Sequence, residues 1–222
     1  MNLLAHPHRV VTAGALVIAL TTAAEVLTAP YSAHVVLYEL NPAVHAIKVV
    51  AALVFVAGML AMAARYRATL GRVGVGAAVA LAAGTTMGAI PYSVVETTLT
   101  PNLDHAQAEA RLDAAYEAQL AWIGHLAMAG MLLLLLGLIT LATVVLRRRL
   151  LPRWRPLLSL AALPFGVLAG VLSETTDLPF PHPPAWIFLC LGIAYAAPLV
   201  ASTDGRPTGS DRATQPSAAT TP

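Results

Sequence analysis

The sequence is poor in charged residues and contains a single cysteine, and each shortage excludes a class of protein. Only 11% of its 222 residues are charged and 58% are hydrophobic, whereas an average soluble domain has about 25% charged and about 45 to 50% hydrophobic residues. An ordinary soluble globular protein is therefore excluded. The net charge of +2 is too small and too scattered for nucleic-acid binding to be the main function. The lone Cys190 excludes an intramolecular disulfide and any metal site with several thiolate ligands.

Long apolar runs are abundant instead. A helix that crosses a membrane needs about 20 mostly apolar residues, and six segments approach or exceed that length: 10–29, 43–64, 73–99, 118–146, 156–173 and 185–201. The last two are short, but a mismatch with the bilayer costs only fractions of a kcal/mol per Å. We therefore predict an all-α polytopic membrane protein in which residues 10–201 form six transmembrane helices. Residues 1–9 form a short N-terminus, and the polar tail 202–222 is predicted to be disordered.

The placement of the arginines predicts how the helices are oriented, because short loops rich in Lys and Arg stay in the cytoplasm. Arg65, Arg67 and Arg72 flank the connection after the second segment, and five more arginines lie between residues 147 and 155. The alternate loops carry mostly Asp and Glu. We expect both termini to be cytoplasmic, in a plasma membrane of the bacterial type, with the acidic loops outside.

The odd-numbered segments end in a similar pattern, in which a glutamate is followed by a proline five residues later. The glutamates are Glu25, Glu96 and Glu174, and a histidine follows each of them after eight or nine residues. The pattern predicts three quasi-repeated helical hairpins, at about residues 10–66, 73–149 and 156–201, related by an approximate threefold axis. The alternative is chance, since proline often follows the end of a helix.

Several ionisable residues fall inside the apolar segments, where each costs at least about 2.5 to 3.5 kcal/mol and is expected to face the bundle interior. The three glutamates lie about one turn inside the outer helix ends. His45 and Lys48 are three residues apart and share a face of the second segment. The candidate catalytic residues are therefore Glu25, Glu96, Glu174, His45, Lys48, His125 and Asp177.

Lys48 is the only lysine in the chain, so it needs a counter-charge, and the three glutamates are the candidates. Pairing would keep one glutamate ionised, while crowding by like charge would keep another protonated. One pocket would then hold a proton donor and a proton acceptor. The alternative is that these charges only hold the hairpins together, or that the glutamates cap helix ends near water.

Aromatic and metal-binding residues add two further hypotheses. Tyr92, Trp122 and Trp186 are the candidate substrate-binding residues, although their location also suits an interfacial aromatic belt. His45, His125 and two of the glutamates could bind zinc, iron or manganese. No metal-binding spacing occurs within any single segment, so the presence of a metal stays open, and the favoured chemistry requires no cofactor.

The cytoplasmic halves of the segments are almost free of polar residues, although a transporter or a pore needs polar groups through its depth. We therefore predict a membrane-embedded enzyme that performs acid/base chemistry, such as isomerisation, cyclisation or elimination, on an apolar lipid- or isoprenoid-like substrate. The alternatives are a proton- or metal-cation transporter that uses the glutamates as its ion site, and a noncatalytic membrane scaffold or sensor. The expected partners are the lipid bilayer and an apolar small molecule, and the chain could form oligomers.

Overall fold

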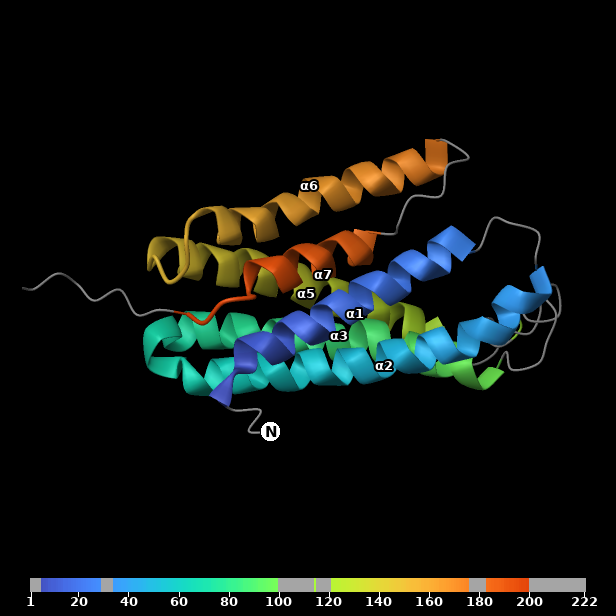
Figure 1. The fold of residues 1–222 in the computed structure, drawn as a ribbon, viewed down its shortest axis with the longest axis horizontal. Coiled ribbons are helices and arrows are strands. Elements are labelled where there is room, and N and C mark those ends of the chain that lie inside the picture. The colour runs from blue at the N-terminus through green and yellow to red at the C-terminus, as the bar shows by residue number, and fades with distance from the viewer. Residues whose placement is uncertain (1–4, 29–33, 100–113, 115–120, 176–182, 200–222) are drawn as a thin grey trace, which may run out of the picture.

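The computed structural model describes residues 5–28, 34–99, 114, 121–175 and 183–199 (Figure 1). The regular elements in this part of the chain are helices, with no strand among them, which confirms the all-α prediction. The helices are α1 (Pro7–Thr28), α2 (His34–Arg65), α3 (Arg67–Leu99), α5 (Ala121–Arg147), α6 (Trp154–Thr175) and α7 (Pro183–Ala194). Each overlaps one of the six predicted segments.

Four of the described helices contain a stretch that is long and apolar enough to cross a membrane: Pro7–Ala24, Ala43–Arg65, Arg67–Pro91 and Trp122–Arg147. Two further apolar stretches, Trp154–Leu168 and Pro184–Ala194, are shorter. The 12 residues of α7 extend about 18 Å at a rise of about 1.5 Å per residue, which is less than the roughly 30 Å of a hydrocarbon layer. The chain has the character of a multi-pass helical membrane protein, and a crossing by all six helices stays a prediction.

The largest differences from the predicted boundaries are at the start of α2 and at the end of α7. α2 begins at His34, nine residues before the predicted segment, because a search for apolar runs detects only the part of a helix that suits a membrane. α7 ends at Ala194, whereas the predicted segment continues to residue 201. Pro198 has no N–H to donate to the Ala194 carbonyl, and its ring would clash with that carbonyl in a helix, so the helix ends early. The predicted tail, 202–222, lies outside the described residues.

The helices form a closed ring of neighbours. Successive helices run in opposite directions, and each packs against the helix before it and the helix after it in the sequence (Figure 1). α7 also packs against α1, where the Thr12 hydroxyl donates a hydrogen bond to the Gly192 carbonyl over 3.1 Å. This arrangement brings the start of α1, the α2–α3 turn, the α5–α6 turn and the end of α7 to one end of the bundle.

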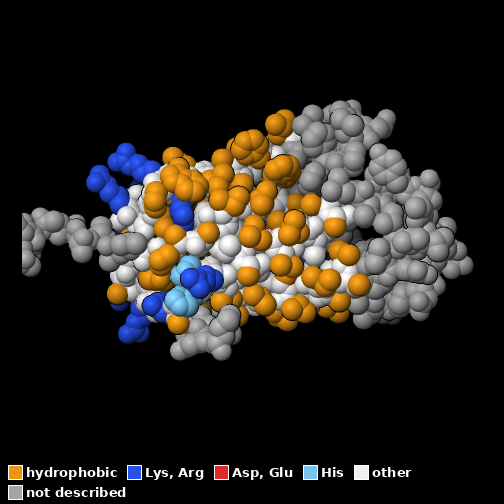
Figure 2. Space-filling view, viewed as in Figure 1, with side chains coloured by type: hydrophobic (Ala, Val, Ile, Leu, Met, Phe, Trp, Pro, Cys, Tyr) orange, Lys and Arg blue, Asp and Glu red, His pale blue; other side chains and the backbone are white. Residues whose placement is uncertain are grey.

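We call this the arginine end, because nine described arginines gather there: Arg9, Arg65, Arg67, Arg72, Arg147, Arg148, Arg149, Arg153 and Arg155. The basic side chains visible in Figure 2 all lie at this end. Some of them tie neighbouring segments together, since Arg148 Nη1 donates to the Thr69 carbonyl over 2.7 Å and Arg65 Nη1 donates to the Ala5 carbonyl over 2.9 Å. We call the opposite end, where α1, α3 and α6 finish, the glutamate end.

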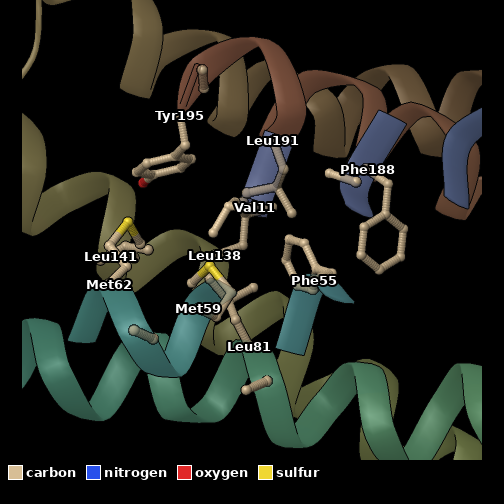
Figure 3. Packing of buried hydrophobic residues seen from close by; sticks show 14 of the residues in the cluster. Val11, Phe55, Met59, Met62, Leu81, Leu138, Leu141, Phe188, Leu191 and Tyr195 are labelled. Atoms are coloured by element: carbon tan, nitrogen blue, oxygen red, sulfur yellow. The ribbon is translucent and has the colours of Figure 1, made fainter. Parts of the chain in front are cut away.

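The interior next to the arginine end is filled with apolar side chains, and we call this part of the bundle the arginine half (Figure 3). Val11, Met59, Leu138 and Leu191, from four different helices, are completely buried. The rings of Phe55 and Phe188 meet edge to face, with centroids 5.2 Å apart and planes at 87°. Side chains from α1, α2, α5 and α7 thus fill the centre of the ring, as expected of a close-packed interior.

Candidate functional site

The three predicted glutamates lie at the glutamate end because α1, α3 and α6 run in the same direction. Glu25 and Glu96 each precede the last residue of their helix by three positions, and Glu174 precedes the last residue of α6 by one. The backbone therefore brings all three to one end of the bundle. Their side chains lie outside the described part of the structure, and Asp177 lies wholly outside it, so their convergence on one site stays a prediction.

His45 occupies the interior face of α2. Its side chain is 3% exposed, and Ala52 and Phe55, further along the same face, are also buried. Lys48, one turn from His45, is half-buried. The imidazole therefore forms the boundary of the apolar core on the side of the glutamate end. Because burial of a polar group costs free energy unless the group is hydrogen-bonded, this position favours a polar or functional role over simple packing.

Thr22 of α1 lies at the same level as His45. α1 and α2 run antiparallel, and a Cβ built on Gly14 would lie 2.6 Å from the Phe55 amide nitrogen, so these two positions are opposite each other. Thr22 lies eight residues after Gly14 and His45 lies ten residues before Phe55, which places them within about one helical turn of each other along the bundle. Thr22 is 3% exposed, and its buried hydroxyl has no hydrogen-bond partner among the described residues.

Trp186 of α7 approaches the same level from the other side of α1. A Cβ built on Gly192 would lie 3.5 Å from the Ala15 Cβ. Trp186, six residues before Gly192, therefore lies within about one turn of Thr22, seven residues after Ala15. Its indole Nε1 is buried and unpaired within the described part of the chain. We call Thr22, His45 and Trp186 the polar layer. A hydroxyl can donate and accept and an indole N–H can donate, so each of these two groups is suited to bind a polar atom of a ligand.

His125 lies on the exposed face of α5, whereas His45 lies on the buried face of α2. Trp122, His125 and Met128 follow one another on α5 at a spacing of three, and all three side chains are exposed. The interior face of α5 presents Gly130 and Leu134 instead. The structure therefore buries His45 and exposes His125, and it does not bring the two histidines into one interior site.

The three predicted substrate-binding aromatic residues lie in different surroundings. Trp186 belongs to the polar layer, whereas Trp122 is 56% exposed, in a position that suits an interfacial aromatic belt. Tyr92 lies on α3, but its side chain is outside the described part of the structure. Of the three, Trp186 has the described surroundings that best suit a binding residue.

The metal hypothesis depends mainly on side chains that are not described. Among those that are, no group of three or more His, Cys, Asp or Glu residues could hold a metal ion. The glutamate side chains of the predicted ligand set are not among the described side chains. Metal binding through His45, His125 and two glutamates therefore stays a prediction, with the two histidines placed as above.

Sequence reasoning did not predict that the hydroxyl groups of Thr22 and Tyr195 are buried. The signal for Thr22 was the pair Thr21 and Thr22, which lies one turn before Glu25 in an apolar run. Thr21 follows the usual behaviour and donates to the carbonyls of its own helix, over 2.9 and 3.0 Å, whereas Thr22 does not. Tyr195, the residue after the end of α7, is 1% exposed, and its hydroxyl has no hydrogen-bond partner in the described structure (Figure 3).

Comparison of the chain with models of known protein families, with curated proteins and with solved structures finds no match. A functional assignment must therefore come from the chemistry and geometry of the residues themselves.

Proposed function

We propose that this chain is a membrane-embedded enzyme whose substrate pocket opens at the glutamate end and has the polar layer as its floor. The observation that carries the proposal is the burial of His45 and Thr22, 3% exposed each, at the same level of a core that is mainly apolar. Polar groups inside a membrane protein are costly and usually serve a site or a pathway. The Trp186 indole N–H at the same level, which is buried and has no hydrogen-bond partner among the described residues, supports the same interpretation.

In this proposal six helices cross a plasma membrane of the bacterial type as three quasi-repeated hairpins. The arginine end and both termini face the cytoplasm, in accordance with the preference of Lys and Arg for that side. The short α7 is accommodated by local thinning of the bilayer, at a modest cost in free energy.

The proposed chemistry is proton transfer to and from an apolar, lipid- or isoprenoid-like substrate. One glutamate, for which we favour Glu96, protonates the substrate, and a second glutamate or His45 removes a proton elsewhere on the molecule. Lys48 supplies the positive charge that keeps the basic carboxylate ionised. Thr22 and Trp186 hydrogen-bond to the polar end of the substrate. Such a pair of proton donor and acceptor supports isomerisation, cyclisation or elimination.

The enzyme proposal is tested by incubating the purified chain in lipid vesicles with an apolar extract of its source membranes. We expect mass spectrometry to show one species consumed and an isomer, or a product lighter by one eliminated molecule, formed. Glu96→Gln removes the acid with little change of shape and should stop this conversion. The control is Thr143→Val in the arginine half, since the Thr143 hydroxyl donates only to the Ile139 carbonyl of its own helix.

Two outcomes contradict the proposal. Conversion that is equally fast with Glu96→Gln would show that this carboxyl has no catalytic role. Flux of protons or divalent cations through the chain in sealed vesicles, stopped by the same substitution, would identify a transporter instead.

The proposed orientation is tested with introduced cysteines, because the native Cys190 is buried and should not react with a membrane-impermeant maleimide. Ala68 at the arginine end and Ala114 are both exposed. We expect Ala114→Cys to be labelled in intact cells and Ala68→Cys to be labelled only after the cells are opened. The reverse pattern would contradict the orientation.

A further inference from the structure

Arg155, in the first turn of α6, differs from the other arginines around it. Its Nε and Nη1 atoms are buried, and no described residue accepts a hydrogen bond from either. Arg147, Arg149 and Arg153, in the same connection, are exposed. A guanidinium group carries a permanent charge and five N–H donors, and burial of such donors without an acceptor is costly. The N–H groups of these two nitrogen atoms therefore favour the approach of an anion.

The surroundings of Arg155 combine an aromatic ring, a second unpaired polar group and an apolar surface. The guanidinium carbon lies 5.1 Å from the centre of the Trp154 ring, within the range of a cation–π interaction. Ser159, one turn after Arg155, is completely buried, and its hydroxyl has no hydrogen-bond partner in the described part of the chain. Trp154 is 54% exposed, and Leu157, Phe165 and Leu168 further along α6 are exposed as well.

We propose that Trp154 and Arg155 form a binding site for the phosphate of an anionic phospholipid. The planar fork of an arginine matches two phosphate oxygens, and the Arg155 side chain is partly exposed, unlike that of Ser159, which is enclosed by protein. Tryptophan rings prefer the depth of the lipid headgroups, which is where the arginine end meets the apolar surface of α6. The acyl chains lie along the exposed Leu157, Phe165 and Leu168. This site is independent of the proposed enzymatic pocket at the glutamate end.

Fluorescence quenching by brominated lipids tests the proposal on the full chain. Trp154 becomes the only tryptophan after Trp122→Phe and Trp186→Phe, and the protein is reconstituted into vesicles of phosphatidylcholine with brominated phosphatidylglycerol or brominated phosphatidylcholine. Charge-assisted bidentate hydrogen bonds should give phosphatidylglycerol a preference of about tenfold at Trp154. Arg155→Gln should reduce the preference to about onefold, and Arg155→Lys should retain only part of it, because lysine lacks the fork.

Arg153→Gln is the matched control, since it removes the same charge from an exposed side chain two residues away. It should keep most of the preference. Absence of any preference before substitution, or an equal loss with Arg153→Gln and Arg155→Gln, would overturn the proposal in favour of diffuse attraction. Millimolar inorganic phosphate should leave the quenching unchanged. Displacement of the brominated phosphatidylglycerol by this phosphate would show a site for free phosphate and would also overturn the lipid assignment.

Discussion

The close approach of α3 and α5 allows one prediction to be worked out from distances. A Cβ built on Gly84 of α3 would lie 2.5 Å from the Leu134 amide nitrogen, 2.6 Å from the Gly130 carbonyl oxygen and 2.9 Å from the Leu134 Cα. All three are backbone atoms of α5, so no side-chain rotation can make room for the added methyl group. Gly84→Ala must therefore push the two helices apart.

The size of the effect follows from the displacement that the methyl group requires. Ordinary van der Waals contact to a Cβ begins at 3.4 Å, so α3 must move about 0.9 Å away from α5, and a gap of about 0.5 to 1 Å already loses a quarter to a half of the dispersion attraction. Overpacking typically costs about 1 to 3 kcal/mol. We expect about 3 kcal/mol, because the added methyl group would lie between the backbones of α3 and α5 and neither can move aside as a side chain can. The higher helix propensity of alanine returns about 1 kcal/mol. The expected net loss is about 2 kcal/mol.

Two other glycines of α3 are matched controls for this change. A Cβ on Gly76 meets nothing within 4 Å, and a Cβ on Gly88 meets only the Ala127 carbonyl oxygen at 3.9 Å. Gly76→Ala and Gly88→Ala should therefore leave the free energy of unfolding unchanged or raise it by up to about 1 kcal/mol. The measurement is reversible unfolding in mixed detergent micelles, followed by far-UV circular dichroism. If Gly84→Ala is as stable as Gly76→Ala, the packing of α3 on α5 described above is wrong.

Three further substitutions can be measured in the same unfolding assay. Gly71 in α3 has φ 66° and ψ 179°, a conformation essentially restricted to glycine, so Gly71→Ala should cost about 1 to 3 kcal/mol, and a neutral result would contradict the backbone conformation at this turn. Tyr195→Phe removes a buried hydroxyl that has no described partner, so stability should stay the same or rise by about 1 kcal/mol; a clear loss would mean that the hydroxyl is bonded. Thr12→Val removes the hydrogen bond between α1 and α7 and should cost about 0.5 to 1.5 kcal/mol, whereas Thr143→Val, which removes a bond within one helix, should cost less.

The positions of the helices could be predicted from the sequence, but the faces that pack could not. Charges and prolines mark the ends of apolar runs, and for this reason each predicted segment overlaps a described helix. Lipid tails are as apolar as leucine, so hydrophobicity does not distinguish the interior face of a membrane helix from its lipid face. Leu20 is 68% exposed and Leu132 is 61% exposed, while Leu81 and Leu138 are completely buried. Small residues such as Gly84 indicate the interface better, because they allow two backbones to approach.

The sequence predicts the parts of the candidate site that depend on charge and on the direction of the helices. It does not predict the parts that depend on which hydrogen bond a single side chain makes. The common end of the three glutamates follows from the alternating direction of the helices, and the interior position of His45 agrees with the cost of an ionisable group at depth. The burial of Thr22 could not be foreseen, because a threonine in an apolar helix usually bonds to its own backbone, as Thr21 does. The exposure of His125 could not be predicted either. Both faces of α5 are apolar, so the sequence does not indicate which face lies in the interior.

The packing of the arginine half limits how a substrate can move through the protein. Phe55 lies ten residues from His45 on α2, about 15 Å towards the arginine end, and there its ring packs against Phe188. Met59 and Leu191, both completely buried, fill the space around these rings, and removal of one such side chain typically costs about 2 to 5 kcal/mol. An ion that crossed from the polar layer to the arginine end would have to displace these side chains and lose its hydration among them. A pocket that opens at the glutamate end and has the polar layer as its floor would therefore not reach the level of Phe55, and its substrate would have to enter and leave on the side of the glutamates or laterally from the lipid.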